Sequence, residues 1–96
     1  MPAYVISEVT IVKDEAVAQY KPLAKQSAIQ RGGEYLARDA VPEALEGSFD
    51  PEERLVISRF PDVNAARAWY GSEAYADALA AADGGLRRRL FIVEGL

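Results

Sequence analysis

The chain has 96 residues, half of them apolar and 27% charged, with a net charge of −4, which favours one globular domain over residues 1–96. The absence of cysteine and histidine excludes disulfides, thiolate chemistry, the usual zinc sites and histidine-based catalytic triads. The acidic balance argues against nucleic-acid binding, and no apolar run approaches the ~20 residues that cross a bilayer, so we expect no membrane contact and a cytoplasmic location.

The first third of the chain predicts a strand, a helix and a second strand. Residues 3–12 are rich in β-branched residues and apolar on both faces, which is typical of a central strand. Asp14 is the expected N-cap of a helix over residues 15–30, with a kink or tightened turn at Pro22. After Gly32-Gly33, residues 34–39 alternate as a second strand.

The middle of the chain is irregular before a well-defined strand. Within residues 40–53 we expect Ala44-Leu45-Glu46 to continue the second strand for a short way beyond a bulge. Residues 54–60 contain a short β-branched run and predict the third strand. Pro61 ends this strand because proline has no N–H to donate to the ladder.

Two capped helices and a last strand complete the pattern. Asp62 should cap a helix that ends at Gly71, and Ser72 should cap another that closes at Gly84-Gly85. Residues 89–94 then form the last strand. The order indicates an α+β, ferredoxin-like βαββαβ fold, with the helices on one face of an antiparallel sheet and the first and third strands at its centre.

The face of this sheet that the helices do not cover, which we call the open face, is the expected place for a functional surface. The expected phase points Val5, Ser7, Val9, Val56, Ser58 and Phe60 at the helices. The open face then holds Tyr4, Ile6, Glu8, Leu55, Ile57 and Arg59, joined by Leu36, Arg38, Leu90, Ile92 and Glu94. A slip of one residue would exchange the two faces. An apolar open face predicts a homodimer in which two sheets form a barrel.

Four charged residues fall in or around this barrel: Glu8, Arg38, Arg59 and Glu94. One interpretation is that they are rim charges paired with each other or with water. The other is a partly buried site for an anionic or carbonyl-bearing small molecule. Arg38 or Arg59 would then bind an oxygen by charge-assisted hydrogen bonds, and Glu8 or Glu94 would be a general base if desolvation raised its pKa. Arg38 is itself a catalytic candidate.

Aromatic residues supply further ligand-binding candidates, namely Tyr4, Trp69 and Tyr75, although each also has a core explanation. Adjacent helical residues lie about 100° apart, so Trp69 and Tyr70 cannot both face the core. The one basic run, Arg87-Arg88-Arg89, is expected to be a solvated helix end or strand start. No carboxylate spacing predicts a metal site, and no motif predicts a cofactor.

Several short segments, taken together over nearly the whole chain, resemble the bacterial family known as domain of unknown function 1330. They are Ala3-Tyr4-Val5-Ile6, Gly32-Gly33-Glu34-Tyr35-Leu36-Ala37-Arg38, Leu45-Glu46-Gly47, Phe60-Pro61, Ala65-Ala66-Arg67-Ala68-Trp69-Tyr70, Ser72-Glu73-Ala74-Tyr75 and Val93-Glu94-Gly95. The resemblance implies a dimeric α/β barrel. The chain departs from the family at Asp39-Ala40, where glycines are expected after the strand-two arginine.

Proteins with the fold that this resemblance implies include cofactor-independent monooxygenases, muconolactone-isomerase-like enzymes and chlorite-dismutase-like haem proteins. Haem ligation by histidine is impossible here. Two hypotheses follow. The first is a homodimer with a small-molecule pocket, between sheet and helices or in the barrel interior, that works as a cofactor-independent oxygenase- or isomerase-like enzyme. The alternative is a non-catalytic dimerisation, ligand-binding or stress-type module in which the same charges set the dimer register.

Overall fold

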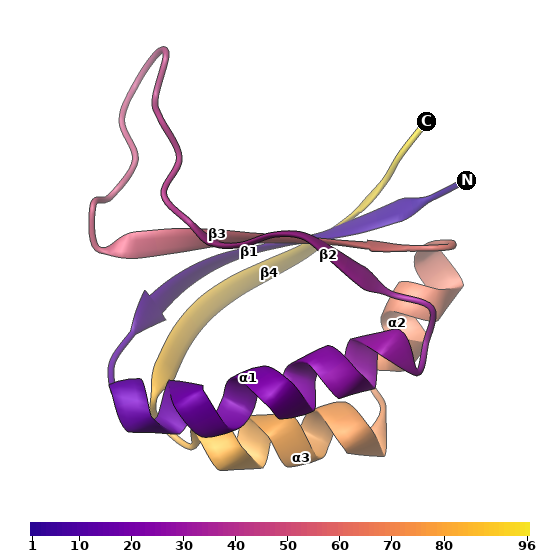
Figure 1. Ribbon diagram of the computed structural model, residues 1–96. Helices are drawn as coiled ribbons and strands as arrows, with labels where there is room; N and C mark the ends of the chain where they lie inside the picture. Colours follow the sequence, from indigo (N-terminus) through magenta and orange to yellow (C-terminus); the bar gives the residue numbers. More distant parts are fainter.

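Four strands form one antiparallel sheet in the computed structural model, which describes all 96 residues. The elements are β1 (Ala3–Ile11), α1 (Asp14–Ile29), β2 (Glu34–Ala40), β3 (Glu53–Phe60), α2 (Val63–Tyr70), α3 (Glu73–Ala82) and β4 (Leu86–Glu94). The strand order β2-β3-β1-β4 confirms the predicted α+β, ferredoxin-like arrangement with β1 and β3 at the centre. Figure 1 shows α1 and α3 side by side beneath one face of the sheet. None of the helices is long and apolar enough to cross a membrane.

Side-chain caps begin two of the three helices. The Asp62 carboxylate accepts the backbone N–H three residues on at 2.7 Å, and the Ser72 hydroxyl does the same at 3.2 Å, as predicted. Helix α1 begins differently: Lys13 occupies the N-cap position in extended geometry, with no side-chain cap bond. The N-cap role predicted for Asp14 is therefore wrong. Asp14 instead lies in the first turn, where its negative charge interacts favourably with the positive end of the helix dipole.

Two predicted boundaries also change. Residues 41–50 contain no strand, so the continuation expected at Ala44-Leu45-Glu46 is wrong. Leu45 is 90% exposed and the backbone turns at Gly47 with a positive φ of 75°, so this segment has no neighbouring strand to pair with. Strand β4 starts at Leu86 rather than residue 89, which places Arg87-Arg88-Arg89 inside the sheet.

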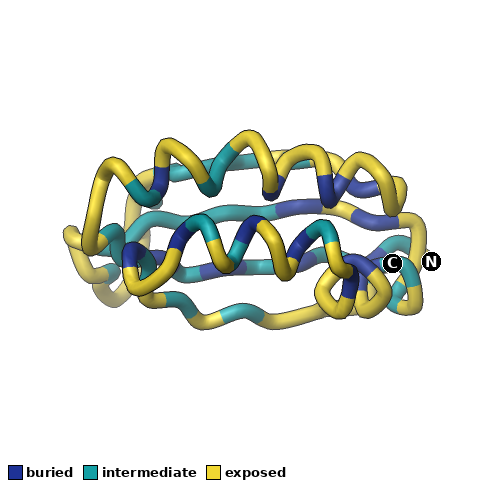
Figure 2. The backbone as a smooth tube through the Cα atoms, turned by 90° about the horizontal axis from the view of Figure 1, so that it is seen from below, coloured by how far each residue is buried: buried dark blue, intermediate teal, exposed yellow.

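The core lies between the sheet and the helices and is thin. Only 18 of the 96 residues are buried, which leaves little apolar burial for one copy of the chain. The predicted phase of β1 and β3 is confirmed, because Val5, Ser7, Val9, Ser58 and Phe60 are all buried. Figure 2, viewed from the helix side, shows buried positions recurring along the helices where they face the sheet, while their outer surfaces are exposed.

The predicted phase of β4 is wrong. Residues directly opposite each other in an antiparallel pair share a face. Leu90 lies opposite Ser7, Ile92 opposite Val5, and Glu94 opposite Ala3, so these three β4 residues belong to the helix side. Phe91 and Val93 take their places on the open face, opposite Ile6 and Tyr4.

The predicted phase of β2 fails at Arg38 because of a bulge. Tyr35 pairs with Ser58 and Ala37 with the next residue back, Ile57, so β2 carries one extra residue at Leu36. Beyond this shift, Arg38 reaches the helix side and donates a hydrogen bond to α1. Asp39 follows with a left-handed φ of 52°, a geometry that aspartate tolerates better than most non-glycine residues. This is the position where the family resemblance leads us to expect glycine.

Candidate functional site

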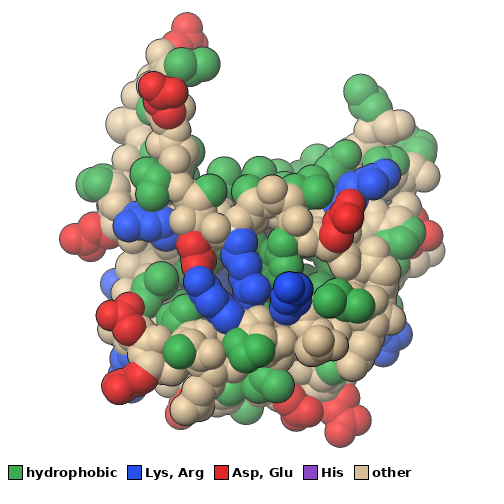
Figure 3. All heavy atoms as spheres, viewed as in Figure 1, with side chains coloured by type: hydrophobic (Ala, Val, Ile, Leu, Met, Phe, Trp, Pro, Cys, Tyr) green, Lys and Arg blue, Asp and Glu red, His purple; other side chains and the backbone are tan.

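A cavity opens between the sheet and the helices at the β2 edge, and we call it the interlayer cavity. Its walls come from β1, α1, β2, β3, β4 and the two short helices, and its volume is about 40 Å³. Figure 3 shows lysine and arginine side chains gathered around a hollow between the two layers. The charged residues that line it are Lys21, Arg38, Asp39 and Arg88. The cavity therefore carries three cations and one carboxylate in a chain whose net charge is −4.

The inner wall of the cavity holds a guanidinium between two phenols, which we call the Arg88 cluster (Arg88, Tyr20 and Tyr75). The Tyr20 and Tyr75 hydroxyls lie 2.9 Å apart. Arg88 Nη1 donates to the Tyr20 hydroxyl at 3.1 Å and also to the Tyr75 hydroxyl. The guanidinium carbon lies 5.7 Å from each ring centroid. Because the three residues come from β4, α1 and α3, the cluster links the edge strand to the two helices that lie side by side.

An aromatic wall holds Tyr75 in place. The Trp69 ring centroid lies 4.3 Å from that of Tyr75, and its indole N–H donates to Ser27 Oγ at 3.0 Å. Ser27 in turn donates to the Ala24 carbonyl of α1 at 2.7 Å. Trp69 is 5% exposed whereas Tyr70 is 54% exposed, which confirms that the two cannot both face the core. This packing leaves Tyr75 few alternative positions, so its hydroxyl is a stable part of the cavity wall.

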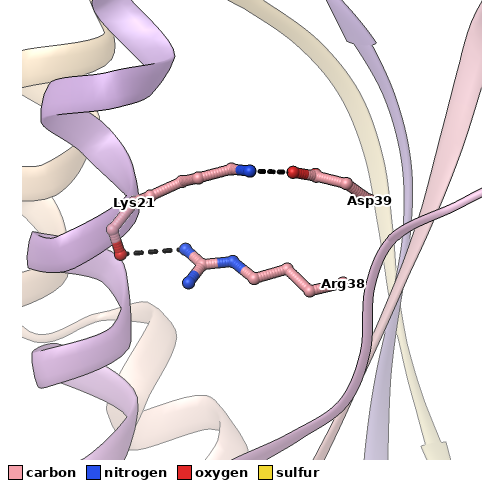
Figure 4. A network of polar contacts seen from close by, with 3 residues as sticks. All are labelled: Lys21, Arg38 and Asp39. Atoms are coloured by element: carbon pink, nitrogen blue, oxygen red, sulfur yellow. Dashed lines mark hydrogen bonds and ion pairs between the residues drawn. The ribbon is translucent and has the colours of Figure 1, made fainter.

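The mouth of the cavity is built from the end of β2 and the middle of α1 (Figure 4). Arg38 Nη2 donates to the Lys21 carbonyl at 2.8 Å, and the Lys21 ammonium pairs with the Asp39 carboxylate. The Arg38 guanidinium also lies over the Tyr35 ring, 4.4 Å from its centroid. The β2 bulge turns Arg38 toward α1, and a second register shift, between Ala37 and Ala40, brings Asp39 to the same side. We call Lys21, Arg38 and Asp39 the charged mouth.

Burial and the contacts between its members shift the pKa values of the Arg88 cluster. Burial raises the pKa of Tyr20 well above its ordinary value of 10.0, and the neighbouring Tyr75 raises it further. Burial alone would lower the pKa of Arg88, but the Tyr75 and Tyr20 hydroxyls more than offset this, and its pKa is raised overall. At neutral pH the cluster therefore holds a charged guanidinium and a protonated Tyr20 phenol. Such a group donates hydrogen bonds and does not act as a base.

The structure brings Arg38, Trp69 and Tyr75 of the predicted candidates to the interlayer cavity. Glu8 and Arg59 lie on the open face, where Glu8 is 4.0 Å from Arg89 and Arg59 is 3.7 Å from Glu34. Tyr4 lies on the open face as well, opposite Arg59 in the register. Glu94 lies beside the start of α2.

One chain therefore does not bring Arg38 together with Glu8, Arg59 or Glu94. Four residues of the site were not predicted from the sequence, namely Tyr20, Lys21, Asp39 and Arg88. Tyr20 lies within the helix predicted over residues 15–30, and no motif there indicates a site. Arg88 stands between two similar arginines, and nothing in the sequence distinguishes it from them. No group of three or more acidic residues lies close enough together to hold a metal ion.

The raised pKa of Tyr20 predicts a loss of stability at alkaline pH. The unfolded chain loses the Tyr20 proton near pH 10 while the folded chain keeps it, so the stability from this group is complete below pH ~10 and is lost as pH rises beyond it. Above pH ~10, the free energy of unfolding of wild type should therefore decrease with pH more steeply than that of Tyr20→Phe. The difference between the two slopes should reach up to about 1.4 kcal/mol per pH unit.

Urea unfolding followed by Trp69 fluorescence between about pH 9 and pH 11.5 measures this slope. The matched control is Tyr70→Phe, which removes an exposed hydroxyl from the same aromatic wall. Identical slopes for wild type and Tyr20→Phe would contradict the burial of a protonated phenol at this position.

Comparisons with known proteins extend the fold assignment. A protein of unknown function from Rhodopseudomonas palustris superposes with a TM-score of 0.77 at 19% identity, over 99% of this chain and 82% of its own. Rv0793 from Mycobacterium tuberculosis superposes at 0.60 and 18% identity, over 100% and 96%. A mutant of SnoaB, a cofactor-independent oxygenase from Streptomyces nogalater, superposes at 0.67 and 12% identity, over 98% and 92%. These identities show a shared fold alone.

Sequence comparison gives the family. No curated protein matches the chain. The model of the family named domain of unknown function, DUF1330, matches residues 2–96, which is nearly the full length. The resemblance seen in the short segments of the sequence is thus confirmed, and the chain belongs to the DUF1330 family.

Proposed function

We propose that this chain forms a cytoplasmic homodimer in which each copy binds the anionic group of a small organic molecule in the interlayer cavity. The observation that carries the proposal is the Arg88 cluster, a partly buried guanidinium and two phenol hydroxyls on the cavity wall. Arg38 and Lys21 add positive charge at the mouth, and Asp39 is the one carboxylate that lines the space. A cavity with this excess of cations favours an oxyanion over a neutral or cationic ligand.

Counting hydrogen-bond donors supports an oxygen-bearing ligand. A guanidinium has five N–H donors, and the two phenols engage only Nη1 of Arg88. The two phenols hold two protons, but only one can lie between their oxygens, so the other hydroxyl has a proton to donate elsewhere. The cluster thus has unused donors from both the guanidinium and a hydroxyl. A carboxylate or enolate oxygen is the complementary acceptor.

A second candidate function is cofactor-free catalysis of the oxygenase or isomerase type. The observation that favours it is the same set of donors, because they would stabilise the negative oxygen of an enolate formed by proton removal. Asp39 is the carboxylate best placed to take that proton, whereas Glu8 and Glu94 do not line the cavity. The fold shared with SnoaB agrees with this chemistry but does not by itself indicate it.

The proposed dimer uses the open face. Phe91 is 43% and Val93 46% exposed there, beside Ile6 and Ile57, in a chain with a thin core. Figure 3 shows apolar side chains along this surface, between the loop of residues 41–52 and the C-terminus, which both rise from it. Charged residues of both signs, in the pairs Arg59–Glu34 and Arg89–Glu8, flank the apolar centre. Such a surface can be complementary to the same surface of a second copy related by a twofold axis. In this dimer the register between the two sheets would be set by Glu8, Arg59 and Arg89, whereas Arg38 lies on the other side of the sheet.

We predict that Arg88→Met weakens binding of benzoate at least about 10-fold, because a hydrogen bond to a charged group contributes roughly 1.5–3 kcal/mol. Chemical-shift titration in a ¹H–¹⁵N spectrum measures the affinity and reports folding at the same time. Arg38→Met should cause a smaller loss, since Arg38 lies at the mouth. The matched control is Arg59→Met on the open face, for which we expect wild-type affinity. If Arg59→Met lost benzoate binding while Arg88→Met kept it, the site would lie on the open face, in the interior of the barrel, and the proposal would be wrong.

We predict that wild type sediments as a dimer and that Ile57→Lys sediments as a monomer. The substitution places a charge at the centre of the open face, where burial against a second copy would be costly. The control is Leu23→Lys, which changes an apolar residue that is 42% exposed on the outer side of α1. Sedimentation velocity measures the oligomeric state of wild type, Ile57→Lys and Leu23→Lys. A monomeric wild type, or an Ile57→Lys dimer as tight as wild type, would contradict the proposed dimer.

A further inference from the structure

The space between sheet and helices has a second opening, at the β4 edge, which we call the β4 groove. It is lined by Tyr70, Leu90, Phe91 and Ile92 together with residues shared with the interlayer cavity, and its volume is about 600 Å³. All but one of its lining residues are hydrophobic, and the exception is Arg88. Tyr70 and Ile92 are 54% and 39% exposed, so this apolar surface faces outward and is not part of the packed core.

The two spaces meet at Arg88. Val5, Trp69, Leu86 and Arg88 line both the interlayer cavity and the β4 groove. On one side of Arg88 lie the Tyr20 and Tyr75 hydroxyls and the charged mouth, and on the other side lie aliphatic and aromatic side chains, Tyr70 among them. A molecule seated at this junction meets hydrogen-bond donors at one end and hydrocarbon at the other.

The two volumes differ in what they can hold. About 40 Å³ suffices for a few water molecules or one small polar group, whereas sites for whole organic ligands usually measure about 300–1,000 Å³. The β4 groove falls within that range. A complete ligand therefore needs both spaces, with its anionic group near Arg88 and its apolar part in the β4 groove.

We propose that the ligand is an amphipathic monocarboxylate whose carboxylate binds Arg88 and whose apolar body lies in the β4 groove against Leu90, Ile92 and Tyr70. This inference rests on the proposed function, because it names the class of anion that the same site takes. The apolar body packs against Leu90 and Ile92, so its contribution to binding scales with the apolar area that it buries. Each methylene buried there tightens binding about 4-fold.

The test uses straight-chain carboxylates of increasing length, from butanoate through hexanoate to octanoate, titrated into the full-length protein by ¹H–¹⁵N chemical-shift mapping. For wild type we expect about 4-fold tighter binding per added methylene, and weaker binding of octanamide than of octanoate because the amide lacks the charge. Ile92→Trp narrows the β4 groove, so its affinity should rise less with each added methylene than that of wild type. Ile92→Gln, which keeps the size and removes apolar surface, should show a reduced gain.

The matched control is Leu23→Trp, because Leu23 is 42% exposed, close to the 39% of Ile92, and lines neither space. This variant should show the wild-type dependence on chain length. Butanoate binding with no gain from longer chains would overturn the amphipathic ligand and leave the proposed function standing. An undiminished gain in both Ile92 variants would overturn the β4 groove as the site of the apolar body. No binding of any carboxylate, butanoate included, would overturn the proposed function as well.

Discussion

The arrangement of the helices over β4 depends on one constraint: a charged guanidinium between the sheet and the helices needs hydrogen-bond partners. Arg88 projects from the edge strand β4 toward the helices, where water is scarce and an unpaired charge is costly. Hydroxyls from α1 and α3 supply its partners, so the same contacts that satisfy the charge also hold both helices over β4. An apolar side chain at this position would need no such partners. Arg88 also has N–H donors that no protein group accepts, and it lines the interlayer cavity. For this reason we propose that Arg88 binds the ligand.

Most of the fold was predictable from the sequence because local signals agree there. β-Branched runs define β1 and β3, and the caps at Asp62 and Ser72 separate α2 from α3. The faces of the two outer strands were not predictable, for two different reasons. In β4 both faces are apolar after Arg89, so alternation gives no preference between Leu90 and Phe91. In β2 an extra residue shifts the phase midway, so regular alternation assigns Arg38 to the wrong side.

These two errors in phase account for the misplaced site. The sequence analysis gathered charges on the open face, whereas the structure divides them between the two sides of the sheet. Glu8, Arg59 and Arg89 stay on the open face in ion pairs, which suits an interface between two copies. Arg38 and Arg88 lie on the helix side around a cavity, which suits an anionic ligand. In the proposed function, one thin sheet thus separates the surface for association from the site for binding.

The measurement that tests this account most directly is a crystal structure of the protein grown with octanoate. The account predicts both carboxylate oxygens near the Arg88 cluster, at least one within hydrogen-bond distance of the Arg88 guanidinium, and the chain leaving along Leu90 and Ile92. A carboxylate bound on the open face beside Arg59, with Arg88 contacting only Tyr20 and Tyr75, would contradict it.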